Sequence, residues 1–416
     1  MASRTAWLKR ALAAASLLAL ACGPLEAATF APERGLNLDL WDTWPNEAEW
    51  SRDGVLLPYP EWRRRLDVED LALLKNVGFD FLRMPVDPIP FLSPKAGHLR
   101  ERLLTSVLEG VRTINAAGLK AIVDLHPIPR GADRFAGVEE LLRDGALFER
   151  YLDLVRDMGR TLAAEDPERV AFELMNEPVT GCEGAEARAW DDQLGQLFAA
   201  ARSSAPRTTL ILSGACWGSA SGLAALNPNT IPDENILWGF HSYDPFILTT
   251  QGALWAGDFI RYVTGVPYPP YEHKAELEAA VSKARARVRA DAPFMRRSGM
   301  LDYLDEQIAG IDTEEELDAQ MDAPFKTVAD WAARYGVDPE NILLGEFGMI
   351  RQEYGNPDVI PGAWRAAYIR DMIEKAEQRG FAWSIWGYGG AFGIVEEFGG
   401  NPAEDDVLRM IRSLKK

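Results

Sequence analysis

The chain has 416 residues, of which 47% are hydrophobic and 26% are charged. This balance is typical of a globular protein with one large domain or two ordinary ones, and it excludes a fibrous repeat or a largely disordered chain. The formal net charge of −19 at pH 7 disfavours nucleic acid and anionic lipid as partners, so a neutral substrate suits the surface better than a polyanion.

The first residues predict a signal peptide. A basic amino-terminal region precedes an apolar stretch at 11–21, which is too short to span a bilayer. We interpret residues 1–27 as a signal peptide that is removed on export, so the protein is expected to be secreted or periplasmic. A lipoprotein signal ending at Cys22 is the second choice and an uncleaved anchor helix the third. No later segment is long and apolar enough to predict a transmembrane helix.

Eight short apolar runs recur along the chain, and helical periodicity separates most of them. The runs are rich in β-branched residues, leucine and aromatic residues, as expected for strands that are buried on both faces. They cover residues 35–40, 79–86, 120–125, 170–175, 208–213, 236–241, 342–347 and 382–386. The helical patterns cover 68–77, 99–117, 147–164, 187–203, 363–380 and 404–414.

This succession of strands and helices predicts a (β/α)₈ TIM barrel that forms one domain over residues 28–416. An open doubly wound sheet is the main alternative. Such a sheet would normally carry a glycine-rich turn after its first strand, and the sequence that follows Gly35 supplies none.

One connection is much longer than a βα unit requires. Residues 246–340, between the sixth and seventh strands, are expected to form an insertion with helical patterns at 275–290 and 314–335. Loops that follow barrel strands surround the active site, so the insertion is expected to form a wall or lid of the substrate cleft. A purely structural subdomain is the alternative. Its aromatic residues are candidates for stacking on sugar rings: Trp255, Tyr262, Tyr268 and Tyr271.

Polar and aromatic residues stand at the carboxyl ends of six predicted strands, where barrel enzymes build their active sites. Each one alone is compatible with an ordinary structural role. Six strand ends with compatible chemistry are difficult to explain by structure alone. The residues are Arg83, His126, Asn176, Glu177, His241, Tyr243, Glu346 and Trp386.

Glu177 and Glu346 end strands four and seven, which face each other across a barrel of eight. Two such carboxyl groups can flank a glycosidic bond. One protonates the leaving oxygen, and the other attacks the anomeric carbon or activates water. We expect repulsion from Glu346 to raise the pKa of Glu177.

The ordered set resembles glycoside hydrolase family 5, the cellulase-type family. Its members carry an arginine after strand two, a histidine after strand three, Asn-Glu-Pro after strand four and His-x-Tyr after strand six. A glutamate follows strand seven and a tryptophan follows strand eight. This sequence matches all eight positions, and the likeness runs from about Gly35 to about Gly393.

The resemblance implies a retaining mechanism with Glu177 as acid/base and Glu346 as nucleophile. It also implies supporting roles: Arg83 and Tyr243 beside Glu346, His241 near Glu177, Asn176 on the sugar 2-hydroxyl, and His126 and Trp386 in the substrate site.

The expected activity is that of an endo-β-1,4-glucanase acting on β-glucan. A β-mannanase or an exo-β-glucosidase is an alternative within the family, because the eight positions do not choose among these substrates. A non-catalytic carbohydrate-binding barrel is an alternative of another class, and the presence of both glutamates disfavours it. A metal-dependent hydrolase is disfavoured because the cysteines and histidines lack metal-ligand spacing. We therefore expect no metal and no cofactor.

Two cysteines lie beyond the predicted signal peptide, Cys182 and Cys216. Both follow predicted adjacent strands, so their loops could meet, and export would permit a disulfide. Two separate buried thiols are an equally compatible interpretation.

Overall fold

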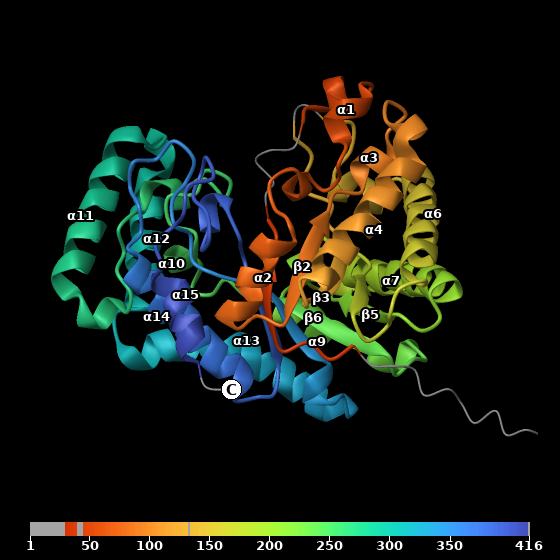
Figure 1. Cartoon of the computed structure of the whole chain (residues 1–416). Helices are drawn as coiled ribbons and strands as arrows, with labels where there is room; N and C mark the ends of the chain where they lie inside the picture. The colour runs from red at the N-terminus through yellow and green to blue at the C-terminus, as the bar shows by residue number, and fades with distance from the viewer. Residues whose placement is uncertain (1–29, 40–44, 132–133, 415–416) are drawn as a thin grey trace, which may run out of the picture.

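The computed structural model describes residues 30–39, 45–131 and 134–414, so the expected signal peptide lies outside the described residues. Eight parallel strands form a closed barrel in chain order, with the last paired to the first (Figure 1). The predicted (β/α)₈ barrel is therefore confirmed. The strands are β1 (Arg34–Asn37), β2 (Phe81–Val86), β3 (Lys120–Leu125), β4 (Val170–Glu173), β5 (Thr209–Ser213), β6 (Ile236–His241), β7 (Ile342–Phe347) and β8 (Ala382–Ile385).

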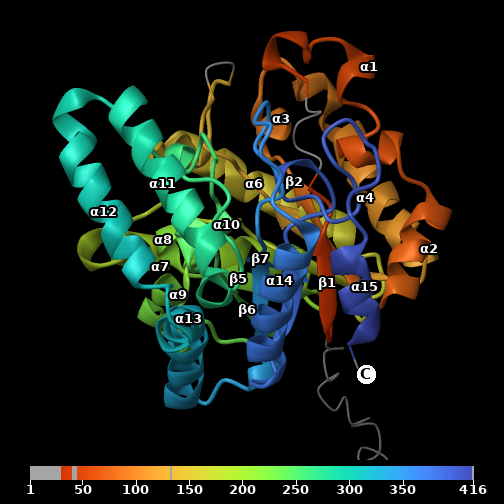
Figure 2. The same cartoon turned by 90° about the vertical axis from the view of Figure 1, so that its left-hand side faces the viewer.

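Helices surround the barrel (Figures 1 and 2). The longer ones are α2 (Val68–Val77), α4 (Arg100–Ala116), α6 (Gly145–Leu162), α7 (Gly184–Ser204), α11 (Lys274–Asp291), α12 (Arg297–Ala309), α13 (Glu314–Tyr335), α14 (Gly362–Glu377) and α15 (Asp406–Ser413). The short ones are α1 (Asp53–Leu56), α3 (Ile89–Leu92), α5 (Val138–Arg143), α8 (Ala215–Gly218), α9 (Ala220–Ala225) and α10 (Phe246–Thr249). In the described part of the chain, no helix combines the length and the apolar character needed to cross a membrane.

Local sequence explains where these helices begin and end. The α2 helix begins at Asp67, whose carboxylate accepts a hydrogen bond from the Asp70 backbone N–H. It ends at Gly78, which has φ 126°, a backbone conformation that favours glycine. The α13 helix is capped in the same way by the Thr313 hydroxyl and ends at Gly336 in the left-handed region.

The lower half of the barrel interior is apolar. Phe81 fills so much of it that a Cβ on Gly35 would lie 2.2 Å from the Phe81 ring, which explains why β1 carries a glycine there. Phe30, which precedes β1, belongs to this cluster, and its other buried members come from β3 to β8: Ile122, Ala171, Ile211, Leu237, Leu343 and Ala382. Buried charged and polar side chains occupy the barrel toward the carboxyl ends of its strands, so the barrel changes from a packed core to a polar site along its axis.

The expected insertion divides into two parts. The α11 and α12 helices stand to one side of the barrel (Figures 1 and 2), whereas α13 belongs to its outer ring. Trp331 of α13 packs edge-on against Trp238 of β6, with ring centroids 5.5 Å apart, and Phe325 packs in the same way on Phe240. The expected boundary of 246–340 was therefore too long, because α13 buries its apolar face on the barrel as an ordinary βα helix does. The α12 helix was not predicted.

The insertion is fastened to the loop that follows β7. Asp358 in this loop accepts hydrogen bonds from Lys283 and Arg287 of α11, at 2.8 and 3.0 Å, and from the Thr264 hydroxyl at 2.9 Å. The hydrogen bond from Lys283, assisted by Thr264 and Arg287, lowers the pKa of Asp358 to about 2 although burial opposes the shift. These contacts hold the insertion against the carboxyl ends of the barrel strands.

We predict that Asp358→Asn lowers the free energy of unfolding by about 1–2 kcal/mol at pH 7. The stabilisation should be fully present above the unfolded pKa of about 4 and should disappear as the pH falls through about 2, because the folded pKa is the lower one. Denaturant unfolding at pH 7 and at low pH measures it. Asp305→Asn is the matched control, since Asp305 pairs with Arg285 on exposed surface and should contribute less than about 1 kcal/mol. Equal losses in both variants would contradict the prediction.

Candidate active site

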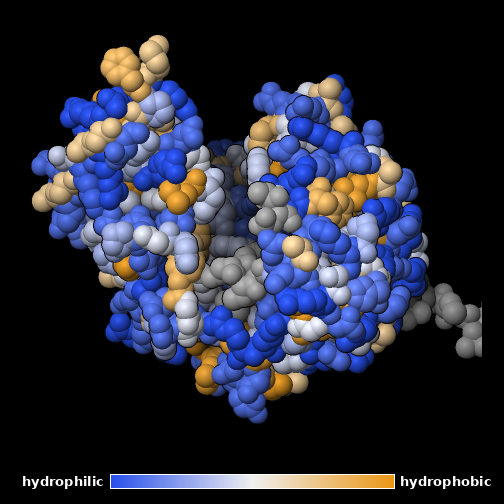
Figure 3. Space-filling model, turned by 90° about the horizontal axis from the view of Figure 1, so that it is seen from above, coloured by the Kyte–Doolittle hydropathy of each residue, from blue (hydrophilic) through white to orange (hydrophobic). Residues whose placement is uncertain are grey.

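The structure brings all eight predicted site residues together at the carboxyl ends of the strands. A hollow lies at this end, between the side that carries α11 and α12 and the opposite side (Figure 3). Each predicted residue contacts at least one other member of the set. The contacts are Arg83–Glu346, Arg83–Asn176, Asn176–His126, His126–Trp386, Tyr243–Glu346, His241–Glu346 and His241–Glu177.

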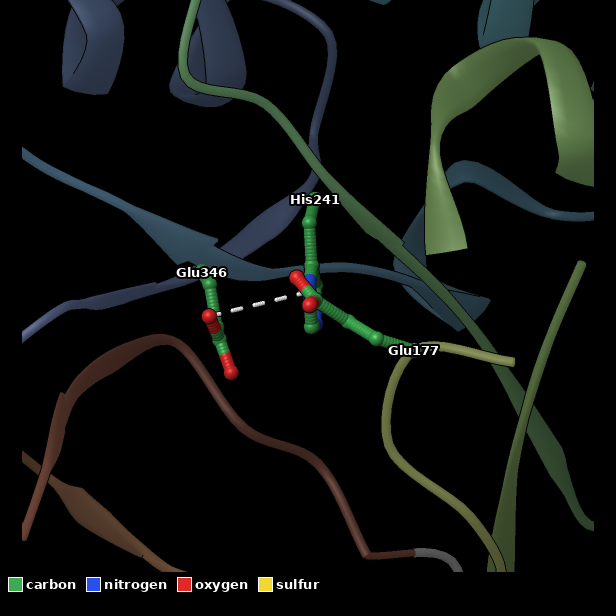
Figure 4. A group of neighbouring side chains, drawn as sticks. All are labelled: Glu177, His241 and Glu346. Carbon is green, nitrogen blue, oxygen red and sulfur yellow. Dashed lines mark hydrogen bonds and ion pairs between the residues drawn. The ribbon is translucent and has the colours of Figure 1, made fainter. Parts of the chain in front are cut away.

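The two glutamates approach each other from opposite sides, with the His241 ring beside them (Figure 4). Nδ1 of His241 lies 2.9 Å from Glu177 Oε1 and 3.7 Å from Glu346 Oε2. The register of β6 against β7 shifts after Phe240, and this shift places His241 opposite Glu346. One oxygen of each carboxyl and a His241 nitrogen all lie within 4.8 Å of one another. A nucleophile that touches the anomeric carbon needs a close carboxyl pair, about 5–5.5 Å apart, and the approach of these nearest oxygens supports such a pair.

Arg83 is the buried centre of the site. Its guanidinium donates to Glu346 Oε1 at 2.7 Å, to Asn176 Oδ1 at 2.8 Å and to Asn37 Oδ1 at 2.9 Å. It also forms a bidentate ion pair with Glu173, in which two guanidinium nitrogens donate to the two carboxylate oxygens at 2.7 and 2.8 Å. A side chain with five N–H donors in a fixed plane can hold several acceptors at once. Arg83 thereby sets the position of Glu346.

The buried carboxylates around Arg83 were not predicted. Asp124 lies 2.9 Å from the Arg83 guanidinium and Glu173 forms the contact described above. Burial raises the pKa of Asp124 to about 7, against the attraction of Arg83. Burial also raises the pKa of Glu173. A usable signal existed in the sequence, because an acid inside an otherwise apolar strand requires a partner when it is buried.

A chain of hydrogen bonds orients Asn176. Its amide nitrogen lies 2.9 Å from His126 Nε2, and an amide nitrogen can only donate, so Nε2 accepts and the proton sits on Nδ1. That Nδ1 lies 2.5 Å from Asp124 Oδ2, and the Asn176 oxygen accepts from Arg83. Both ends of the amide are thus assigned, and the second amide hydrogen of Asn176 can serve a sugar hydroxyl.

Burial is the main cause of the raised pKa of Glu177. It raises the pKa of Glu177 to about 7, against the attraction of Arg83, and repulsion from Glu173 adds to the shift. The predicted rise is therefore confirmed, but the expected cause, repulsion from Glu346, is not: burial is the main cause, and the carboxylate that adds to it is Glu173.

Tyr243 completes the surroundings of Glu346. Its hydroxyl donates to Glu346 Oε2 at 3.0 Å. Burial, together with the Glu346 charge, raises the pKa of Tyr243 well above its usual range, so Tyr243 remains a donor. The ligand atoms of Glu177, His241 and Glu346 lie close enough to hold a metal ion. Among the described residues, however, Arg83 and Tyr243 already engage both oxygens of Glu346.

The aromatic candidates separate into different environments. Trp386 stacks on His126, with centroids 5.5 Å apart and an interplanar angle of 28°. Trp255 is 60% exposed and lies 6.3 Å from Phe392, which packs on Tyr243, so Trp255 stands in the wall beside the site.

The other aromatic candidates of the insertion are less exposed than Trp255. The prediction that Tyr268 stacks on sugar is wrong, because Tyr268 is buried and its hydroxyl donates to Asp371. Tyr262 and Tyr271 pack partly against the hydrophobic core, and their role in binding sugar stays a prediction.

Trp217 stands next to the loop that carries Glu177, and the sequence did not predict this. Its side chain is half exposed, and its backbone N–H donates to the carbonyl of Pro178, the neighbour of Glu177. The preceding residue forms a disulfide, Cys182–Cys216, with a Cα separation of 4.5 Å. A tryptophan next to a cysteine carries no signal of exposure in the sequence.

Comparisons with known proteins identify the family of the chain. The family model for cellulase, glycosyl hydrolase family 5, matches residues 59–392. Endoglucanase 3 of Fibrobacter succinogenes is 24% identical over 350 residues, which is 80% of this chain and 47% of that protein. Endoglucanase C of Acetivibrio thermocellus is 27% identical over 202 residues, 48% of this chain and 57% of that protein. The chain thus spans about half the length of these curated relatives.

Solved structures show the same fold at low identity. The cellulose synthase subunit Z of Clostridioides difficile has a TM-score of 0.62 and 21% identity, covering 91% of this chain and 99% of that one. Cel5A of Thermotoga maritima, solved with cellobiose, has a TM-score of 0.62 and 18% identity, covering 92% of this chain and 97% of that one.

We predict that Glu177 titrates near pH 7. Carbon-13 NMR of glutamate labelled at the side-chain carboxyl measures this directly, and Glu177→Gln assigns the signal. Glu173→Gln should lower the pKa of Glu177, because it removes a negative neighbour. A midpoint at the usual value for an exposed glutamate, about 4.3, would contradict the role given to burial.

Proposed function

The chain belongs to the cellulase family, glycosyl hydrolase family 5, and on this premise we propose that it is a retaining β-glycosidase, an endo-β-1,4-glucanase. The observation that carries the proposal is the close carboxyl pair, with oxygens of Glu177 and Glu346 within 4.8 Å of each other. Such a spacing supports direct attack on the anomeric carbon.

The first step follows from the contacts of the pair. A Glu346 oxygen attacks the anomeric carbon while the bond to the leaving oxygen breaks, and Glu177 gives its proton to that oxygen. Arg83 and Tyr243 each hold one oxygen of Glu346, which aims the nucleophile. Because the pKa of Glu177 is about 7, it keeps the required proton in weakly acidic solution.

In the second step Glu177, now ionised, takes a proton from water. The water oxygen bonds to the anomeric carbon, and the bond to Glu346 breaks, so the configuration is retained overall. Asn176 is proposed to bind the sugar 2-hydroxyl through its second amide hydrogen. Trp386 offers its ring face to the sugar between the two carboxyl groups.

Several observations support a glucan and cleavage within the polysaccharide chain. The curated relatives described above are endoglucanases, and the exposed Trp255 and Trp217 offer stacking surface beyond the catalytic pair. β-Mannan is a second candidate, because the related Cel5A of Thermotoga maritima has also been solved with mannotriose. We also propose that the protein is exported, since the predicted signal peptide and the disulfide are typical of oxidising compartments.

We predict the highest kcat/KM on β-1,4-glucan in a panel of cellulose oligomers, mixed-linkage glucan, β-1,3-glucan and mannan. Internal cleavage should give cellobiose and longer products early in the reaction, as resolved by chromatography. Release of single glucose units alone would instead indicate exo action. A preference for mannan would favour the second candidate, and inactivity on the whole panel would contradict a glycosidase.

A further inference from the structure

The loops that follow β4 and β5 are joined at three points. The Cys182–Cys216 disulfide is the covalent one. The N–H of Trp217 donates to the carbonyl of Pro178 at 3.0 Å, and the N–H of Cys216 donates to that of Thr180 at 3.2 Å. All three links fall on the few residues that directly follow Glu177, so the β5 loop is tied to the backbone that carries Glu177.

The joined backbone is strained where it meets the catalytic residue. Glu177 has φ 41°, and Cys216 and Trp217 both have φ 59°. These values lie in the left-handed region of the backbone, which residues other than glycine occupy at a cost in free energy. Such conformations persist only when the surrounding structure holds them. The next residue, Gly218, packs so near that a Cβ there would lie 3.8 Å from Glu177 Cγ and from His241 Nδ1.

Trp217 differs from most other described tryptophans. Trp50, Trp62, Trp190, Trp331 and Trp383 are among the largest fully buried side chains, whereas Trp217 is half exposed. It follows β5, which pairs directly with β4, and its backbone N–H donates to the carbonyl of Pro178, the residue after Glu177. Trp217 therefore stands on the Glu177 side of the pair, where the leaving group of a glycoside is protonated. An exposed indole at this point suits the apolar face of a sugar ring.

We propose that the Cys182–Cys216 disulfide is a positioning element of the active site. It holds Trp217 as the platform for the leaving-group sugar and fixes the backbone of Glu177. The proposal rests on the glycosidase function proposed above and adds a consequence to it. The contacts of Glu346 with Arg83 and Tyr243 lie outside the joined loops, so loss of the disulfide should impair protonation of the leaving group more than nucleophilic attack.

The test compares the wild type with the double variant Cys182→Ala/Cys216→Ala on two substrates. Cellotetraose has a poor leaving group and needs both protonation and the sugar platform. The 2,4-dinitrophenyl β-cellobioside has an activated leaving group that needs neither. We expect the fold-decrease in kcat/KM that the double variant shows on cellotetraose to be about ten times the fold-decrease that it shows on the aryl glycoside. The limb of the cellotetraose pH profile that reports the Glu177 proton should also move.

Trp217 variants separate the platform from the fold. Trp217→Ala, with the disulfide intact, should weaken turnover of cellotetraose by about three- to tenfold, and Trp217→Phe should restore most of it. Phe294→Ala is the control, since Phe294 is exposed at the turn between α11 and α12. This substitution should leave kcat/KM unchanged on both substrates. If the double variant does not fold by circular dichroism, the same two-substrate comparison is made on folded wild type after reduction with a phosphine.

The outcomes separate the two proposals. Equal losses on both substrates in a folded variant, or no loss on either, would overturn the positioning role while the glycosidase function stands. Full activity of Trp217→Ala on cellotetraose would overturn the platform. A wild type that is inactive on both substrates would overturn the proposed function itself, and the positioning proposal with it.

Discussion

A single buried guanidinium holds the site together. Arg83 contacts three carboxylates, Asp124, Glu173 and Glu346, at 2.9, 2.7 and 2.7 Å. None of these charges would be tolerated alone in the barrel interior, because burial without a partner costs several kcal/mol for each ion. Together they form a network in which the cation has an acceptor in several directions. The position of the nucleophile follows from this network, and so does that of Asn176, which links Arg83 to His126.

The barrel makes such a network rigid. Its lower half is filled by apolar side chains such as Phe81, so the charged layer above rests on a close-packed core. Residues that must hold fixed distances stand on strands or directly after them. Two loops carry further candidate residues for binding sugar, and each loop is held in place by its own contacts. Asp358 binds the insertion that carries Trp255, and the Cys182–Cys216 disulfide binds the loop that carries Trp217.

The order of residues at strand ends explains why the barrel and the eight contacting site residues could be predicted from the sequence. Other features depend on three-dimensional surroundings. The pKa of Glu177 is raised mainly by burial. How deeply a side chain is buried cannot be read from its neighbours in the sequence. Tyr268 and Trp255 are both aromatic residues of the insertion and have the same sequence signal. In the folded protein Tyr268 is buried, whereas Trp255 is exposed. The helical period of α13 fits a barrel helix and an inserted one equally well, so only its packing on β6 defines the insertion.

The central claim is that Glu346 forms a covalent bond to the sugar. Incubation with an activated 2-deoxy-2-fluoro-β-cellobioside slows the second step and should trap this species. Peptide mapping by mass spectrometry should then find the sugar on the peptide that contains Glu346, and Glu346→Gln should remain unlabelled while Glu340→Gln, at the amino-terminal end of β7, labels as the wild type does. Label on another residue, or an active wild type that never becomes labelled, would contradict the account.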